Sequence, residues 1–112
     1  MRVLLGLTMV LSLAGCYDPA DNCLNDRSAK IGAYVASQSI VKTKLRSPSS
    51  AKFPAFGDRD VNVLFEWKCN FKVAGFVDAQ NAFGGTVRTR YIIEIKADPE
   101  TGGYTGRNLL MD

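Results

Sequence analysis

The sequence predicts an α+β domain, in which one N-terminal amphipathic helix packs on an antiparallel sheet of about four strands. Two observations favour this fold. Apolar residues recur at helical spacing between Ser28 and Leu45, and from residue 61 onward apolar and polar residues alternate in segments that turn-forming stretches separate. The chain has 112 residues, of which 46% are hydrophobic and 22% charged, a length and composition typical of one small folded domain.

The predicted helix spans Ser28 to Leu45. One stripe of its surface carries the apolar residues Ile31, Tyr34, Val35, Val41 and Leu45. Ser37 falls outside this stripe, and Ile40 points to the far side of the helix. Because a proline disfavours helical conformation in the residue before it, Pro48 predicts that the helix ends at Leu45 or Arg46.

Four later segments alternate as strands with one buried face do. The predicted strands are 61–66, 71–78, 86–96 and 104–111, with turns at 66–70, 80–85 and 98–103. A register that places Asp78 opposite Thr86 brings Phe71 opposite Ile93, so the two central strands share one apolar face. We expect that face to meet the helix.

The opposite face of the sheet carries arginines among apolar residues, and we expect it to face solvent. In the predicted register Phe76 lies across from Arg88, which leaves Phe76 and Ile92 exposed among cations. The candidate binding surface combines this face with the tip of the adjoining hairpin, and it consists of Phe76, Gln80, Asn81, Phe83, Arg88 and Arg90. The competing interpretation of the tip is hairpin-loop chemistry, in which Asp78 and Asn81 accept backbone hydrogen bonds.

The first fifteen residues have the layout of a secretory signal peptide. Arg2 gives a positive start, residues 3–13 are mostly apolar, and small residues precede Cys16. A helix of this apolar length would span roughly 16 Å, about half of a hydrocarbon core, which disfavours a permanent transmembrane helix. The tetrad Leu13-Ala14-Gly15-Cys16 resembles the lipobox of bacterial lipoproteins. This resemblance implies cleavage before Cys16 and attachment of acyl chains such as palmitate to its thiol and its new amine.

Two other interpretations of the N-terminus stay open: an ordinary secreted protein in which Cys16 is incidental, and a buried N-terminal strand of a cytosolic domain. The lipobox interpretation divides the chain into a signal peptide at residues 1–15, a lipid-attached tether at 16–27 and the α+β domain at 28–112. Each buried methylene adds about 0.8 kcal/mol, so two or three acyl chains would hold the domain firmly to a bilayer.

With Cys16 assigned to lipid, Cys23 and Cys69 form an even pair in an exported chain, and we predict a disulfide between them. The alternative is a redox pair or a metal site, but the usual Cys-X-X-Cys spacing and a third ligand are both missing from this pair. Trp67 lies beside Cys69 in the sequence. Its first interpretation is packing against the disulfide, and its second is an anchor for binding.

Two stretches of the domain carry a further resemblance: Leu45–Pro54 (LRSPSSAKFP), and Gly75–Gly84 (GFVDAQNAFG) followed by Val87-Arg88-Thr89. Together they resemble a small domain of bacterial and phage-encoded proteins, often exported or membrane-attached, whose members are largely uncharacterised. The resemblance covers roughly residues 28 to 96. It implies the order of helix then sheet, and it supplies no catalytic residues.

The residues of the chain offer little catalytic chemistry. It has no histidine, which removes imidazole metal sites and the commonest general base. Two carboxylate pairs, Asp58 with Asp60 and Asp98 with Glu100, lie in turn-like stretches, so an enzyme that uses them is the weakest alternative. We expect no enzyme activity, no cofactor and no metal site. From Cys16 onward 13 basic and 11 acidic residues are interspersed, and a net charge of +2 indicates no nucleic-acid partner.

These observations favour a membrane-anchored, non-catalytic lipoprotein of a bacterial cell envelope, facing the periplasm or the exterior. Its expected partners are the membrane, through the lipid on Cys16, and an envelope protein. One alternative is an inhibitor of a cell-wall hydrolase, similar in size and location to the lipoproteins that inhibit lysozyme. Another is an exclusion lipoprotein of a phage or mobile element.

Overall fold

The structure is a computed structural model that describes residue 23 and residues 25–112. The predicted signal peptide, the lipobox with Cys16 and most of the predicted tether lie outside the described residues. The elements in chain order are α2 (Arg27–Lys42), the 3₁₀ turn η2 (Pro48–Ser50), β1 (Asn62–Phe65), β2 (Asn70–Gln80), β3 (Thr86–Ala97) and β4 (Tyr104–Met111).

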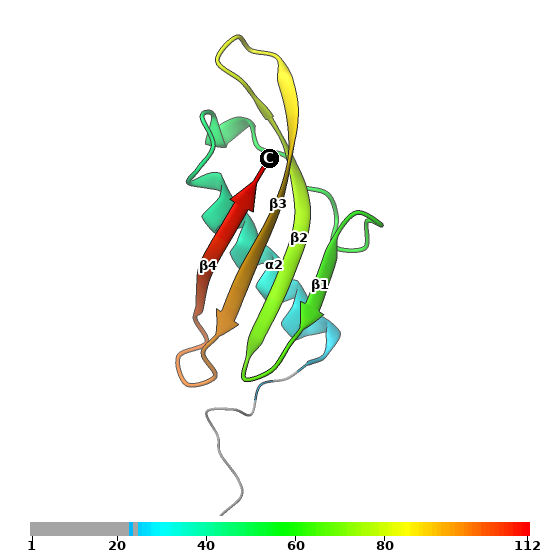
Figure 1. The fold of residues 1–112 in the computed structure, drawn as a ribbon, viewed down its shortest axis with the longest axis vertical. Coiled ribbons are helices and arrows are strands. Elements are labelled where there is room, and N and C mark those ends of the chain that lie inside the picture. The colour runs from blue at the N-terminus through cyan, green and yellow to red at the C-terminus, as the bar shows by residue number, and fades with distance from the viewer. Residues whose placement is uncertain (1–22, 24) are drawn as a thin grey trace, which may run out of the picture.

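The described part of the chain forms two layers, a four-stranded antiparallel sheet and the helix α2, which covers one face of it (Figure 1). The strands lie in the order β1-β2-β3-β4, so each strand pairs with its neighbour in the sequence. This arrangement confirms the predicted α+β fold and the three predicted turns between the strands.

Helix α2 begins where Asp26 caps its first turn, since the Asp26 carboxylate accepts a hydrogen bond from the Ala29 amide at 2.9 Å. The helix ends at Lys42, three or four residues before the predicted end at Leu45 or Arg46. Beyond it, the amides of residues 43–45 bond to carbonyls three residues back rather than four, which tightens the chain out of α-helical geometry. The Thr43 hydroxyl also donates to the Ile40 carbonyl at 2.6 Å, a local bond that competes with continuation of the helix.

The buried face of α2 differs from the predicted stripe. Ser37 is fully buried, and Ile40 packs against the core, whereas Val35 is 52% exposed. The prediction failed because it treated Ser37 as a surface residue. Its hydroxyl donates to the Tyr34 carbonyl at 2.6 Å and lies 3.1 Å from the Tyr91 hydroxyl, so its polar atom is satisfied inside the core.

The core lies between α2 and the inner face of the sheet. Alternate residues of β2 and β3 point into it, as the sequence pattern predicts, and the fully buried ones include Phe71, Val73, Val77, Ile93 and Ile95. Phe65 of β1 meets Phe71 edge to face, with 5.4 Å between ring centroids.

The register between β2 and β3 differs by two residues from the predicted one. Asp78 lies opposite Arg88, and Gln80 lies opposite Thr86, so the connecting loop has five residues, 81–85. The prediction paired Asp78 with Thr86 and so made this loop too long. Because side chains alternate with a period of two, a two-residue slip changes every partner and leaves each residue on its predicted face.

The β2–β3 hairpin projects beyond the ends of β1 and β4 (Figure 1). The loop after η2 braces its base, since Lys52 and Asp78 exchange backbone hydrogen bonds of 2.8 and 3.0 Å. The Gln80 amide also donates to the Ser50 hydroxyl at 2.9 Å. Lys52, in the stretch Leu45–Pro54, therefore pairs with β2 beyond residues 71–74, which are the residues of β2 that pair with β1.

Strand β4 contains a bulge at Asn108, which has a left-handed φ of 56°. The bulge reverses the alternation of the strand. Leu109 and Met111 after it pack against the core, while Leu110 lies opposite Ile92 on the outer face. The C-terminal end of β4 thus contributes Leu110 to the surface that faces away from the helix.

Candidate functional site

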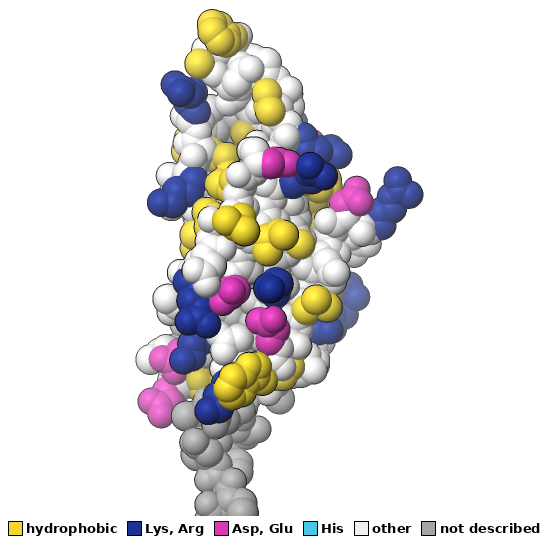
Figure 2. Space-filling view, viewed as in Figure 1, with side chains coloured by type: hydrophobic (Ala, Val, Ile, Leu, Met, Phe, Trp, Pro, Cys, Tyr) yellow, Lys and Arg dark blue, Asp and Glu magenta, His cyan; other side chains and the backbone are white. Residues whose placement is uncertain are grey.

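The outer face of the sheet carries a groove of about 650 Å³ at the base of the projecting hairpin. Its floor is formed by Ala74, Phe76, Ile92 and Leu110, and charged residues at its rim are Asp60, Arg88, Arg90 and Asp112. We call this site the outer-face groove. Figure 2 shows hydrophobic side chains gathered on the middle of this face, with basic and acidic side chains around them.

Arg88 covers one end of the groove floor. Its guanidinium carbon lies 3.9 Å from the centroid of the Phe76 ring, within the range of a cation–π contact. Its Nε and Nη2 donate to the two carboxylate oxygens of Asp78, at 2.8 and 2.9 Å. Phe76 is consequently only 8% exposed, which corrects the expectation of an exposed ring. Asp78 binds Arg88 with its carboxylate, not the backbone of the loop.

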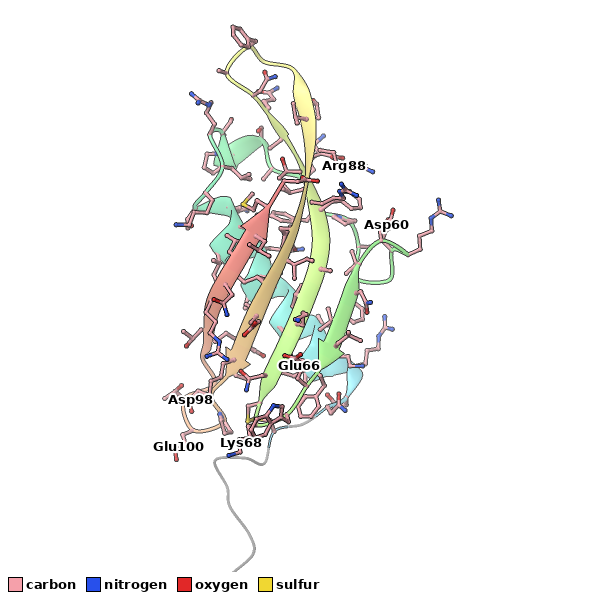
Figure 3. The ribbon with its side chains drawn as sticks, viewed as in Figure 1. Asp60, Glu66, Lys68, Arg88, Asp98 and Glu100 are labelled. Atoms are coloured by element: carbon pink, nitrogen blue, oxygen red, sulfur yellow. A yellow bond between two sulfur atoms is a disulfide. The ribbon has the colours of Figure 1, made fainter. Side chains whose placement is uncertain are left out.

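This bidentate pair shifts the titration of the acidic partner. The hydrogen bonds from Arg88, helped by its charge, hold the pKa of the Asp78 carboxyl below its usual value. Asp60, on the loop before β1, adds a further negative charge on the same side of the groove (Figure 3). The rim near Arg88 therefore carries a cation surrounded by carboxylates.

Arg90 forms the second charged part of the rim. The Asp112 carboxylate accepts from the Arg90 amide at 2.8 Å and from its Nε at 2.9 Å, and these bonds lower the pKa of Asp112. A guanidinium has five N–H donors, so donors of Arg90 are left over for acceptors on a bound molecule. The sequence reasoning missed Asp112.

Ile92 and Leu110 form the exposed apolar part of the floor, with 44% and 68% of their surface accessible. Leu110 was also missed by the sequence reasoning. Leu110 and Asp112 were both missed because of the bulge in β4, which places Leu110 opposite Ile92 and brings Asp112 level with Arg90. A strict alternation of the last strand conceals this placement.

The structure separates the six predicted binding residues into two groups. Phe76, Arg88 and Arg90 meet at the groove, whereas Gln80, Asn81 and Phe83 belong to the end of the hairpin. Asn81 has a structural role there, because its side-chain oxygen accepts from the amides of Phe83 at 2.9 Å and Gly85 at 3.0 Å. Phe83 is 96% exposed at the tip.

The predicted disulfide between Cys23 and Cys69 is present, with 5.2 Å between the Cα atoms. It connects the segment before α2 to the turn between β1 and β2. Trp67 in this turn is 65% exposed, which leaves most of its surface open to solvent, as its second interpretation, an anchor for binding, requires. The ammonium of Lys68 lies 4.9 Å from the centroid of the indole ring.

In each of the two carboxylate pairs that the sequence offers as catalytic candidates, one carboxylate accepts a backbone hydrogen bond within a turn. Asp58 accepts from the Asp60 amide at 2.9 Å, and Asp98 accepts from the Glu100 amide at 2.9 Å. The Glu100 amide lowers the pKa of Asp98, whereas a general acid at neutral pH needs a raised pKa. Among residues 23 and 25–112, no group of three or more histidine, cysteine, aspartate or glutamate side chains is placed to hold a metal ion.

No protein-family model, no curated protein and no solved structure matches the chain. In the part of the chain that the structure describes, no helix has the length and apolar character needed to cross a membrane. A functional proposal therefore depends on the geometry of the outer-face groove and on the sequence signals at the N-terminus.

Proposed function

We propose that the chain is a lipid-anchored, non-catalytic lipoprotein of a bacterial envelope that binds another protein through the outer-face groove. The observation that carries the proposal is the composition of this groove. Its floor exposes Ile92 and Leu110, and its rim presents arginines whose charges are already paired. An apolar floor with a polar rim that retains hydrogen-bond donors is the anatomy of a protein-binding surface.

The groove fits a partner that offers an apolar side chain flanked by acceptors. Burying Ile92 and Leu110 removes apolar surface from water, which favours association. Backbone carbonyls or carboxylates of the partner can accept from the N–H groups of Arg90 that Asp112 does not use. The lipobox and the disulfide, typical of exported chains, support placing this partner in the cell envelope.

Site-specific crosslinking in living cells tests this proposal. A photo-reactive amino acid at Leu110, in the groove, is compared with one at Leu64, which is 53% exposed on the same face of the sheet but outside the groove. We expect one discrete adduct from position 110 and none from position 64. Ile92→Ser in the same chain should remove the adduct, and Cys16→Ala should weaken it by releasing the protein from the membrane.

The opposite result would overturn the proposal. Equal adducts from both positions, or an adduct that survives both Ile92→Ser and the double change Arg88→Ala/Arg90→Ala, would show that the groove does not select a partner. Purified protein with Ile92→Ser must retain the far-UV circular dichroism of the unchanged chain for the comparison to count.

The projecting hairpin favours a second candidate function, inhibition of a cell-wall hydrolase. Phe83 stands almost fully exposed at a tip that Asn81 holds in one shape, and a narrow preformed loop suits insertion into an enzyme cleft. Inhibition of lysozyme by the purified domain, lost in Phe83→Ala and kept in Ile92→Ser, would support this function over binding through the groove.

A further inference from the structure

The turn between β1 and β2 is the place where the N-terminal segment is joined to the sheet. The disulfide attaches Cys23 to Cys69 in this turn. The turn itself is closed by a bond from the Asn70 amide to the Trp67 carbonyl at 3.1 Å, and the Cys69 carbonyl accepts from the Ala97 amide at 2.9 Å. These bonds hold the turn rigidly at the end of the sheet opposite the projecting hairpin (Figure 1).

Trp67 is the large apolar side chain that this turn exposes. It is 65% exposed, and the Lys68 ammonium lies over its ring. A tryptophan with an apolar ring and a polar N–H is suited to the boundary between lipid headgroups and water, where both parts are satisfied. It is also the single tryptophan of the chain.

The length of the chain before the disulfide limits how far this turn can lie from a lipid anchor. Six residues separate Cys16 from Cys23. Fully extended, this segment spans at most about 25 Å, and the disulfide adds 5.2 Å between Cα atoms, so an acyl group on Cys16 keeps the turn within about 30 Å of the bilayer surface. Strand β2 has 11 residues and leads away from the turn, which puts the Phe83 tip more than about 30 Å farther along the sheet.

We propose that Trp67 inserts into the headgroup region of the membrane that holds the lipid on Cys16, so that the domain stands with its hairpin tip away from the bilayer. The inference rests on the proposed lipid anchor. It assigns a second membrane contact, which converts a tethered domain into an oriented one. The outer-face groove then lies along the side of the standing domain, accessible to a partner.

The charges around the turn make this contact independent of acidic lipids. At the same end as Lys68, the carboxylates of Glu66, Asp98 and Glu100 are present (Figure 3), and one further cation, Lys96, lies beside Asp98. Electrostatic attraction to an anionic surface needs a clear excess of cations, which this end lacks. We therefore expect the same insertion into zwitterionic and into anionic bilayers.

Because Trp67 is the single tryptophan, its fluorescence tests the inference directly. Full-length lipidated protein is reconstituted into phosphatidylcholine vesicles, with and without lipids brominated near the headgroup. We expect the brominated lipids to quench the emission. We also expect the quenching constant for aqueous iodide to fall about twofold or more, relative to Cys16→Ala protein mixed with the same vesicles, as the headgroups shield the ring.

A matched control moves the fluorophore to the other end of the sheet. In Trp67→Phe/Phe83→Trp the tryptophan stands at the hairpin tip, where we expect full quenching by iodide and none by brominated lipid. Quenching of both positions by lipid would mean that the domain lies flat, and would overturn the proposed orientation.

Two further outcomes separate this inference from the lipid anchor on which it rests. If the protein floats with the vesicles while brominated lipid leaves Trp67 unquenched, the inference is overturned and the anchor stands. A blue-shifted emission without lipid quenching, which indicates contact with protein, overturns it equally. If mass spectrometry finds no acyl group on Cys16 and the protein does not float, the lipoprotein proposal fails and the inference fails with it.

Discussion

The guanidinium of Arg88 lies over the ring of Phe76, 3.9 Å from its centroid, and donates two hydrogen bonds from its edge to the carboxylate of Asp78. The three side chains lie on two neighbouring strands, so the arrangement depends on the register of β2 against β3. It buries an aromatic ring on a face that otherwise meets solvent. Arg88 thus forms part of the rim of the groove and also lowers the pKa of Asp78.

Arg88→Gln should raise the pKa of Asp78 toward the ordinary value of an aspartate, because the bidentate donor that stabilises the carboxylate is lost. Carbon-detected NMR of the side-chain carboxyls between about pH 2 and 6 measures this change. Arg107→Gln is the matched control. It removes a donor to Glu94, and we expect it to raise the pKa of Glu94 while Asp78 keeps its low value.

The sign of the associated stability change follows from the direction of the shift. The folded state lowers the pKa of Asp78, so the pair stabilises the fold above the pKa of the unfolded chain and loses this effect as pH falls through the folded-state pKa. Acid unfolding of Arg88→Gln should therefore lack this contribution. An Asp78 midpoint that is the same in both arginine variants would contradict the account of the pair.

Ser37→Ala should lower the free energy of unfolding by about 1–3 kcal/mol, because the buried Tyr91 hydroxyl loses its partner. The Ser37 hydroxyl donates to the Tyr34 carbonyl, so Tyr91 is the donor in their contact. In a double-mutant cycle measured by urea unfolding, Tyr91→Phe should cost less in the Ser37→Ala background than in the original chain. Strict additivity of the two changes would show that the hydroxyls do not interact.

Alkaline pH should destabilise the fold through Tyr91. Burial raises the pKa of Tyr91 to about 12, whereas the phenol ionises near its ordinary pKa of 10.0 when exposed in the unfolded chain. The raised pKa means that stability is complete below the lower value and declines as pH rises from about 10 to about 12. Unfolding of Tyr91→Phe should depend less steeply on pH across this window, and an unchanged slope would contradict the assignment.

Gly75→Ala should destabilise the domain by about 1–3 kcal/mol, because a methyl group there meets a packed aromatic side chain. An added Cβ would lie 3.2 Å from the Tyr91 hydroxyl oxygen and 3.3 Å from its ring carbon Cζ. Gly57→Ala is the control, since nothing lies within 4 Å of its added Cβ. Thermal unfolding compares the two, and equal midpoints would contradict the close packing of Tyr91 over Gly75.

Removal of the disulfide through Cys23→Ala/Cys69→Ala should lower the free energy of unfolding by up to about 4 kcal/mol, since the bond closes a long loop in the unfolded chain. Urea unfolding of the double variant and of the oxidised chain gives the difference. Reduction of the unchanged protein serves as the control and should reproduce it. A loss of stability below about 1 kcal/mol in both the double variant and the reduced protein would indicate that the unfolded chain gains little conformational freedom when the disulfide is absent.

The sheet was predictable because its signals are local. Alternation around Phe71 and Ile93 identifies a buried face, and Gly-rich or Asx-rich stretches identify the turns. The register was not predictable at the same level. It depends on the closure of the loop at Asn81, whose side chain bonds two amides, and alternation reads the same after a slip of two residues.

The arginines of the candidate site were predictable from the sequence, but the carboxylate that pairs with Arg90 was not. Arg88 and Arg90 stand out in the sequence of β3, but Asp112 is distant in sequence and reaches Arg90 only because of the bulge at Asn108. The prediction that Ser37 lies outside the buried stripe failed for a related reason, since a hydroxyl is buried only where the fold provides hydrogen-bond partners for it. Local patterns cannot supply such long-range pairings.

The disulfide between Cys23 and Cys69 also determines the path of mechanical load through the domain. A pull on the chain ahead of Cys23 passes through the sulfur atoms into the turn before β2, and not into the first turn of α2. From there the tension runs to the hairpin along the covalent backbone of β2, whose cross-strand hydrogen bonds to β3 lie perpendicular to the strand and keep it in register. Helix α2 lies in the chain between Cys23 and Cys69, in parallel with the disulfide, so it bears none of this tension. A pull between a lipid anchor and a partner at the far hairpin would therefore leave the helix folded.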